Sequence, residues 1–229
     1  MQAASSSRAE RDLQVARVGV GVANRPLLID VSFRLRPGER VAVRGPSGCG
    51  KTSLLRAVAG LDDLSRGEVT LGGQSPQQMG WPCWRRQVTY VSQEPVLFAG
   101  SIRDNLARPF RYRSAAGAFP KDTARAWLER LGLAQRWSEM DATHLSVGER
   151  QRVALVRALV VTPAVVLLDE PTSALDESAR QAVEQLVSER CDHDGLAAIV
   201  VTHLESQALE WCDTSLDLRE HVAREHEHA

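Results

Sequence analysis

Residues 45–52 read Gly-Pro-Ser-Gly-Cys-Gly-Lys-Thr and directly follow the strand-like run Arg40–Arg44. This is the pattern G-x-x-x-x-G-K-S/T, placed between a predicted strand and, over Ser53–Ala59, a predicted helix. The glycines let the backbone curl so that successive N–H groups point at one phosphate, and the positive end of the helix faces the same anion. Lys51 would bridge the terminal phosphates, and the Thr52 hydroxyl would hold Mg²⁺. The sequence therefore predicts a site for a nucleoside triphosphate.

The loop residues that we expect to contact the nucleotide are Gly45, Pro46, Ser47, Gly48, Cys49, Gly50, Lys51, Thr52 and Ser53. Cys49 lies at a predicted helix N-terminus beside Lys51, and such surroundings favour oxidation or alkylation of a thiol. The four cysteines are scattered and form no C-x-x-C pair, so the sequence indicates neither a zinc site nor a disulfide framework. An ordinary reduced thiol and a redox switch therefore both stay open at Cys49.

Composition and charge limit the class of protein. The chain has 229 residues, 43% of them apolar, which suits one α/β domain with a modest subdomain. The net charge is -1 with both signs interspersed, so there is no global basic field of the kind that binds nucleic acid regardless of sequence. No apolar run approaches the roughly 18 residues of a membrane span, and Met1–Arg11 lacks the apolar stretch of a secretory signal. We therefore expect a soluble, intracellular protein.

Apolar, β-branched runs predict strands at Leu13–Val18, Val31–Leu35, Val41–Val43, Val69–Leu71, Val88–Val91, Val165–Leu168 and Ala198–Val201. The segment Ser101–Arg136 differs, because its apolar residues repeat at helical spacing from Ala124 to Leu131 and no strand is evident. Within this segment, Pro109–Pro120 has the composition of a loop. A helical insertion therefore interrupts an α/β core.

A second motif is the apolar run Ala164–Leu168, which ends in the carboxylates Asp169 and Glu170. It is typical of a buried parallel strand that delivers acids to the carboxyl edge of a sheet, where open α/β folds bind ligands. Asp169 would hold Mg²⁺, and Glu170 would orient or polarise a water for attack on the terminal phosphate. An acidic pair alone could be ordinary strand termination, but beside a phosphate loop it indicates chemistry on the nucleotide.

Further motifs appear in the order of one known family. Leu145–Arg152 reads L-S-V-G-E-R-Q-R, which resembles L-S-G-G-Q followed by Q-R, the signature of the ATP-binding subunits of ABC transporters. Gln93 matches the Q-loop of that family, Ser173–Asp176 matches its D-loop, and His203 matches its switch histidine. The resemblance extends over Leu13–Leu218, and the signature separates this family from kinases and GTPases that share the phosphate loop.

The resemblance implies an α/β fold of the phosphate-loop, ABC type, with a mixed or parallel sheet, N-terminal antiparallel strands and an inserted α-helical subdomain. The expected organisation is a disordered N-terminus at 1–11, an ATP-binding domain at 12–219 with its helical subdomain at about 95–160, and a flexible tail at 220–229. The histidines and glutamates of that tail suit either a metal sensor or a solvated charged terminus.

In this family, ATP with Mg²⁺ lies between the phosphate loop of one subunit and the signature of a second copy, so the resemblance implies a dimer that closes on ATP. It assigns catalysis to Glu170, His203, Gln93 and Lys51, and the metal ion to Thr52, Gln93 and Asp169. Ser146 and Gly148 would contact the nucleotide from the second copy.

Three positions depart from the family pattern. Val147 and Glu149 replace a glycine and a glutamine of the signature, which adds a side chain and a negative charge. Because Ser146 and Gly148 are retained, we expect the signature to tolerate further changes less well but to keep its function. Val22 stands where an adenine-stacking aromatic usually lies. Missing base stacking of about 1–3 kcal/mol predicts relaxed base selectivity, with GTP competing against ATP.

The segments Trp84–Val88 and Gln93–Leu106 look like exporter ATPase domains, although this chain has no membrane spans of its own. We expect a peripheral subunit on the cytoplasmic face of the inner (plasma) membrane that energises a separate permease, in metal (iron) export, and binds no nucleic acid. An importer ATPase for amino acids or phosphate is the main alternative. A soluble ABC ATPase acting on nucleic acid or the ribosome is more remote, because 229 residues leave no room for long coiled-coil insertions or tandem nucleotide domains.

Overall fold

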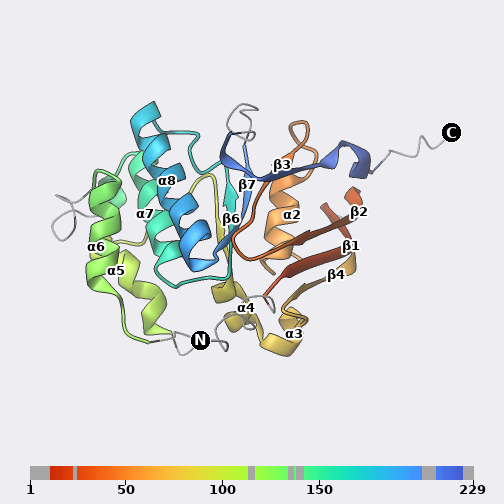
Figure 1. Cartoon of the computed structure of the whole chain (residues 1–229), viewed down its shortest axis with the longest axis horizontal. Coiled ribbons are helices and arrows are strands. Elements are labelled where there is room, and N and C mark those ends of the chain that lie inside the picture. Colours follow the sequence, from red (N-terminus) through yellow and green to blue (C-terminus); the bar gives the residue numbers. More distant parts are fainter. Residues whose placement is uncertain are drawn as a thin grey trace.

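The computed structural model describes residues 11–22, 25–112, 117–133, 137, 142–202 and 210–223. Their strands form two sheets (Figure 1). The antiparallel sheet has the order β2-β1-β4 and consists of β1 (Leu13–Val22), β2 (Arg25–Leu35) and β4 (Arg66–Leu71). The parallel sheet has the order β5-β6-β7-β3-β8 and consists of β3 (Arg40–Arg44), β5 (Val88–Val91), β6 (Val165–Asp169), β7 (Ala197–Val201) and β8 (Thr214–Asp217). The seven strands expected from the sequence are therefore present.

The α-helices are α2 (Lys51–Val58), α3 (Pro76–Met79), α4 (Trp81–Gln87), α5 (Ile102–Ala107), α6 (Lys121–Arg130), α7 (Val147–Leu159) and α8 (Glu177–Asp194). Short 3-10 helices are η1 (Arg108–Arg111) and η3 (Ala142–His144). In Figure 1, α5, α6 and α7 gather at one end of the molecule, and α2 lies with the antiparallel sheet at the other. Within the described part of the chain, no helix combines the length and the apolar character needed to cross a lipid bilayer.

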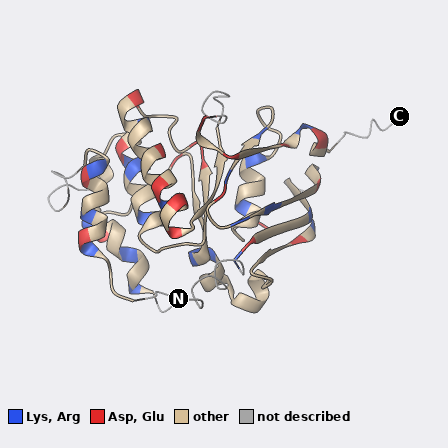
Figure 2. Cartoon of the chain, viewed as in Figure 1, with Lys and Arg blue, Asp and Glu red and all other residues tan. Residues whose placement is uncertain are grey.

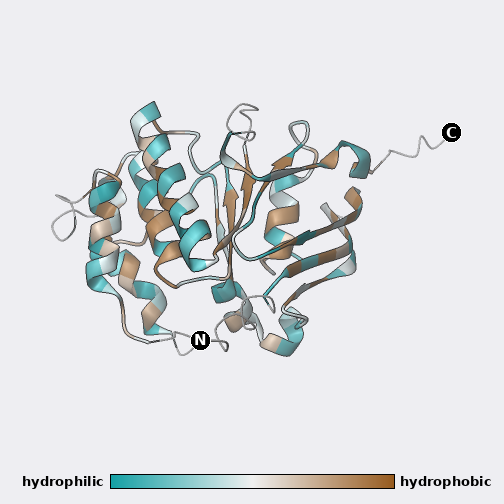
Figure 3. Ribbon diagram, in the orientation of Figure 1, coloured by the Kyte–Doolittle hydropathy of each residue, from teal (hydrophilic) through white to brown (hydrophobic). Residues whose placement is uncertain are grey.

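Strands β6 and β7 are buried along their whole lengths, because both faces of the parallel sheet are covered. Val165 and Leu167 belong to the core that includes residues of α2 and the antiparallel sheet. Val166 and Leu168 belong to the core that includes residues of α5, α6 and α7. Successive side chains of one strand thus enter opposite cores, and Figure 3 shows the resulting apolar band through the centre of the molecule. This double burial explains why Ala164–Leu168 is continuously apolar and does not alternate.

The C-terminal strand β8 is absent from the sequence-based expectation, because Thr-Ser-Leu-Asp is short and its side chains are exposed or half-buried. It pairs in parallel with β3, from Thr214 opposite Val41 to Asp217 opposite Arg44. The next four residues form the 3-10 helix η4 (Leu218–His221). The chain then returns to the antiparallel sheet, where the backbone N–H of Ala223 donates to a β2 carbonyl over 2.9 Å. The chain is therefore hydrogen-bonded to the antiparallel sheet as far as Ala223, and the expected tail at 220–229 stays a prediction.

Trp84 joins helix α4 to the end of helix α2. Its ring is fully buried, and its Nε1–H donates to the carbonyl oxygen of Val58 at 3.0 Å. Because Val58 is the last residue of α2, this carbonyl belongs to the helix end that lacks partners within the helix.

We expect Trp84→Phe to lower the free energy of unfolding by about 2 kcal/mol, because it leaves a buried acceptor unpaired and a small cavity behind. Urea denaturation measures this loss, provided that the slope of the unfolding free energy against urea concentration is the same for the parent and the variant. Tyr112→Phe is the matched control, since Tyr112 is 59% exposed and its change should stay within about 0.5 kcal/mol. Equal midpoints for the two variants would contradict the assigned role of Trp84.

Candidate nucleotide-hydrolysis site

The predicted motifs follow strands of one parallel sheet and therefore meet at its carboxyl edge. The phosphate loop follows β3, Gln93 follows β5, Asp169 is the last residue of β6, and Glu170 comes directly after it. The strand β7 lies between β3 and β6 and ends at Val201. The predicted switch residue His203 lies outside the described residues.

The phosphate loop curls around its own lysine. Lys51 is buried, and its Nζ donates to the carbonyl oxygens of Gly45 at 2.8 Å and Pro46 at 3.0 Å. Gly48 and Gly50 have φ values of +75° and +105°, in the left-handed region that glycine adopts most easily. A Cβ at Gly48 would meet no atom within 4 Å, so this side of the loop is open. The loop thus has the shape of an anion cradle with a cation at its base.

Cys49 is packed into the core beneath the loop. It is 6% exposed, and a Cβ built at Gly45 would come within 2.8 Å of its Sγ. This packing restricts access of reagents to the thiol. The redox switch at Cys49 stays a prediction.

Asp169 is a buried acid held by two hydroxyl groups. Its Oδ2 accepts from Thr52 Oγ1 at 2.8 Å and from the Tyr90 hydroxyl at 2.9 Å. Burial, and then the charge of Asp169, raise the pKa of Tyr90 well above its ordinary value. The phenol therefore keeps its proton and remains a donor. The sequence analysis did not identify Tyr90, although a tyrosine on the strand next to β6 could have indicated a hydroxyl donor at this edge.

Glu170 occupies an uncommon backbone conformation at the end of β6. Its φ is +48°, in the left-handed region that costs a non-glycine residue free energy. Its backbone N–H donates to the carbonyl of Val201 at 3.0 Å, which fixes the turn. Gln93 Nε2 donates to the Glu170 carboxylate at 2.8 Å. The structure therefore brings together the Q-loop residue and the acid that the sequence assigned to water activation.

The signature begins helix α7. Ser146 is the N-cap, and it forms a capping box with Glu149: Ser146 N–H donates to Glu149 Oε2 at 2.8 Å, and Glu149 N–H donates to Ser146 Oγ at 3.2 Å. The acid that replaces glutamine thus satisfies the helix end, a role that either side chain performs. Val147 is 45% exposed. A Cβ at Gly148 would lie 2.7 Å from the Ala174 carbonyl oxygen, so a larger residue there would collide with the D-loop backbone.

Gln151 connects three motifs. Its side chain is buried, and Nε2 donates to the carbonyl of Gln93 at 3.0 Å and to Ser173 Oγ at 3.1 Å. One amide on α7 thus contacts the Q-loop residue and the first residue of the D-loop. The sequence pattern contained this glutamine but gave no reason for its burial.

The residues present fit Mg²⁺ bound together with phosphates. Thr52 and Asp169 offer a hydroxyl and a carboxylate, and the Gln93 amide uses its nitrogen on Glu170, which leaves its oxygen as a donor. Hard oxygen donors suit this ion, and sites that share it with phosphates need only one or two carboxylates. Accordingly, the described residues contain no group of three or more His, Cys, Asp or Glu side chains that could hold a metal without a ligand's help.

Comparison with known proteins supports the assignment of this edge of the sheet as a site for ATP. The ABC transporter family profile matches residues 28–173. The chain is 35% identical over 212 residues to the probable iron export ATP-binding protein FetA of Escherichia coli (strain K12), covering 92% of each chain. It is 38% identical over 196 residues to the sulfate/thiosulfate import ATP-binding protein CysA 1 of Agrobacterium fabrum, covering 82% of this chain and 55% of the relative. A solved ATP-binding subunit of an ABC transporter superposes with a TM-score of 0.82 at 28% identity, covering 90% of this chain and 85% of that one.

Tyr90→Phe tests the hydroxyl that holds Asp169 and keeps the ring. We expect the Mg²⁺ concentration for half-maximal ATP hydrolysis to rise about tenfold, because a partner that orients a metal ligand is removed. Titration of activity with Mg²⁺ at saturating ATP measures this shift. Tyr112→Phe is the control, and an unchanged Mg²⁺ dependence in Tyr90→Phe would show that the hydroxyl only fills space.

Proposed function

Because this chain belongs to the ABC transporter family of ATP-hydrolysing proteins, we propose that it is the subunit that couples ATP hydrolysis to transport through a separate membrane permease. The observation that carries this proposal is the Thr52–Asp169 hydrogen bond, which joins the phosphate loop to the acidic strand end. The family's signature lies at the start of a different helix, α7, where Ser146 and Val147 are exposed at the surface.

Within one chain, each residue has a distinct task. Lys51 would exchange the loop carbonyls for oxygens of the terminal phosphates, where its charge offsets theirs. Thr52, Asp169 and Gln93 would hold Mg²⁺, which supplies charge neutralisation on the phosphates. Glu170 would accept a proton from, or orient, the attacking water. By resemblance, His203 would contact the terminal phosphate.

The second half of the site would come from another copy of the chain. Ser146 lies at the N-terminus of the 13-residue helix α7, where free backbone N–H groups and the helix dipole attract an anion. Gly148, which packs against Ala174, keeps the helix start close to the D-loop. We propose that this surface closes over ATP held by the partner copy, so that binding assembles the dimer and hydrolysis opens it.

The cargo path would belong to the permease, with this subunit at the cytoplasmic face of the inner (plasma) membrane. The chain matches 92% of the length of an ATPase named for iron export, and this similarity favours metal export as the transport process. An importer role is the second candidate, because the comparable identity to a sulfate/thiosulfate import protein leaves the direction open. The chain spans about half the length of that importer relative. The part of the relative outside the match therefore says nothing about this chain.

Replacing the proposed catalytic acid tests hydrolysis and dimer formation together. In Glu170→Gln we expect ATP turnover to fall about 100-fold or more, while ATP and Mg²⁺ convert the protein to a dimer in size-exclusion chromatography with light scattering. Glu68→Gln, at an exposed position on β4, is the matched control. Turnover at the parent rate, or a Glu170→Gln monomer with ATP, would contradict the assigned role.

The same variant tests the transport partner. Tagged Glu170→Gln, incubated with detergent-solubilised native membranes and ATP, should retain a multi-span membrane protein whose co-expression alters the ATPase rate of the parent chain. Recovery of ribosomes or nucleic acid in its place would favour the non-transport alternative.

Base selectivity is a separate prediction from Val22. The side chain of Val22 lies outside the described part of the structure. With no aromatic ring to stack on adenine, GTP should compete with ATP at comparable concentration. Competition of GTP against a fluorescent ATP analogue measures this, and Val22→Tyr should restore preference for ATP; strong ATP preference in the parent would contradict the prediction.

A further inference from the structure

Four residues around the acidic end of β6 form a closed ring of hydrogen bonds. The Gln93 amide donates to the Glu170 carboxylate at 2.8 Å, and the backbone N–H of Ser173 donates to the Glu170 carbonyl at 3.3 Å. Gln151 closes the ring, because its Nε2 donates both to the Ser173 hydroxyl oxygen at 3.1 Å and to the Gln93 carbonyl at 3.0 Å. We call these four residues the amide ring. It joins helix α7 to the acid that we assign to water activation.

Gln151 is the member of the ring with the most rigid support. It is 3% exposed and lies on α7, a 13-residue helix that begins with the capping box of Ser146 and Glu149. It follows Gly148 by three residues and therefore shares a face of the helix with it. A Cβ at Gly148 would lie 2.7 Å from the Ala174 carbonyl oxygen, so this face packs closely on the D-loop. Groups on a packed helix are placed more accurately than groups on loops.

Gln93 lies in an irregular part of the chain. Residues 92–100 form neither helix nor strand, and Gln93 is exposed. A glutamine side chain in such a place has several rotamers, and ordering one of them costs conformational entropy. The position of the Gln93 amide therefore depends on the contacts that fix the backbone around it.

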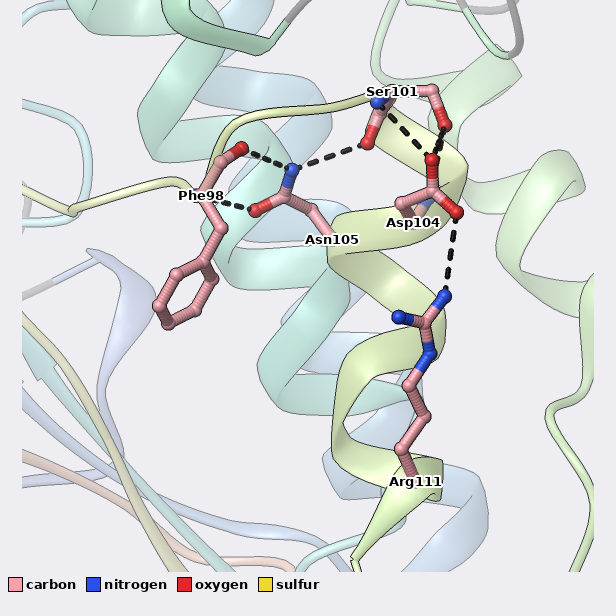
Figure 4. Close-up of polar contacts among 5 residues, drawn as sticks. All are labelled: Phe98, Ser101, Asp104, Asn105 and Arg111. Atoms are coloured by element: carbon pink, nitrogen blue, oxygen red, sulfur yellow. Dashed lines mark hydrogen bonds and ion pairs between the residues drawn. The ribbon is translucent and has the colours of Figure 1, made fainter.

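Side chains of the helical part hold this irregular segment near both of its ends. Asn105 on α5 clamps Phe98: Phe98 N–H donates to Asn105 Oδ1 at 2.8 Å, and Asn105 Nδ2 donates to the Phe98 carbonyl at 2.9 Å (Figure 4). Gln151 on α7 holds the carbonyl of Gln93. Of these two contacts, the one from Gln151 acts at the residue whose side chain reaches Glu170.

The amide of Gln151 can face the ring in one orientation only. A backbone carbonyl accepts hydrogen bonds and never donates them, so the nitrogen of the amide must point to Gln93. The oxygen Oε1 is then buried without a hydrogen-bond partner among the described residues. A buried acceptor in this state destabilises a fold. Stability alone therefore does not explain a glutamine at position 151.

The donor that the amide ring offers to Glu170 is neutral. Figure 2 shows acidic bands along α8, and acids of that helix pair with arginines, as Glu184 does with Arg180 at 2.7 Å. In the amide ring, Glu170 accepts from the uncharged Gln93 side chain. Such a donor directs the carboxylate and leaves it the negative charge that a group accepting a proton from water needs. The direction of this carboxylate therefore depends on where the Gln93 amide lies.

We propose that Gln151 is a positioning residue for ATP hydrolysis: from helix α7 it fixes the Gln93 carbonyl and so places the amide that orients Glu170. Because the same nitrogen also contacts Ser173, the D-loop shares in this positioning. The inference rests on the proposed function, which assigns water activation to Glu170. Both hydrogen bonds of the Gln151 side chain lie away from the phosphate loop, so ATP binding does not depend on them.

Gln151→Met tests this role, because methionine has a similar length and no hydrogen-bond donor. We expect kcat for ATP hydrolysis to fall about tenfold, while the affinity for a fluorescent ATP analogue stays within about twofold of the parent, as expected when only the chemical step is affected. Gln185→Met, the same change at an exposed position on α8, is the matched control and should keep the parent rate. Parent-level turnover in Gln151→Met, or an equal loss of turnover and ATP affinity, would overturn the inference.

A second background separates positioning from a general effect on packing. If Gln151 acts through Gln93, Gln151→Met should lower kcat less than about twofold in a chain that already carries Gln93→Ala. A purely structural role of Gln151 predicts the same tenfold loss in both backgrounds, and that result would contradict the inference. Single-turnover hydrolysis of radiolabelled ATP measures these low rates.

Ser173→Ala reaches the same ring from the surface. Ser173 is exposed, so this change leaves the core intact even if Gln151→Met fails to fold. It removes one of the two acceptors that hold the Gln151 amide, and we expect kcat to fall about threefold in the parent and to stay unchanged in Gln93→Ala. Parent-level turnover in Ser173→Ala, or the same loss in both backgrounds, would show that the ring does not position Glu170.

The two levels of the proposal fail differently. If Glu170→Gln keeps the parent turnover, the assigned role of Glu170 fails, and the positioning role of Gln151 fails with it. If Glu170→Gln loses turnover but Gln151→Met and Ser173→Ala do not, only the positioning inference is wrong.

Discussion

Asp169 is the buried charge around which the nucleotide edge of the sheet is arranged. A single oxygen of its carboxylate accepts hydrogen bonds from Thr52 on α2 and Tyr90 on β5, so three elements are fixed relative to one another. A carboxylate this deeply buried needs such donors, because desolvation without them would be costly. The strand that carries it is buried on both faces, and the end of β6 therefore has a defined position against the phosphate loop.

The helical part of the chain is connected to this edge through a second set of contacts. Gln151 on α7 bonds to the backbone of Gln93 and to the hydroxyl of Ser173, while Gly148 packs directly on Ala174. The start of α7 therefore cannot shift without disturbing the segments that follow β5 and β6. In the dimer proposed above, such contacts would connect the two halves of each site.

Tyr90 links the nucleotide edge to a neighbouring pocket of about 320 Å³, which Arg86, Arg108 and Arg157 also line. Its ring lines the pocket and its hydroxyl holds Asp169, so both regions share one side chain. The positions of Arg108 and Arg157 around Phe98 arise from segments that are distant in sequence, and Asn105 fixes the backbone between them. Neither arginine belongs to a motif with recognisable spacing. Only the fold shows that these cations converge where no lining acid is available.

The parts whose chemistry depends on short local spacing could be predicted from the sequence alone. The phosphate loop, the acidic end of β6 and the seven strands follow from glycine conformation, apolar runs and residue order, all of which are properties of neighbouring residues. Other features depend on contacts between distant segments. Strand β8, for example, forms only when β3 offers an edge. Likewise, Tyr90 and Gln151 gain their partners only when strands and helices distant in the chain pack together. Contacts between residues so far apart in the sequence form only when the hydrophobic core has packed, and no local sequence pattern specifies them.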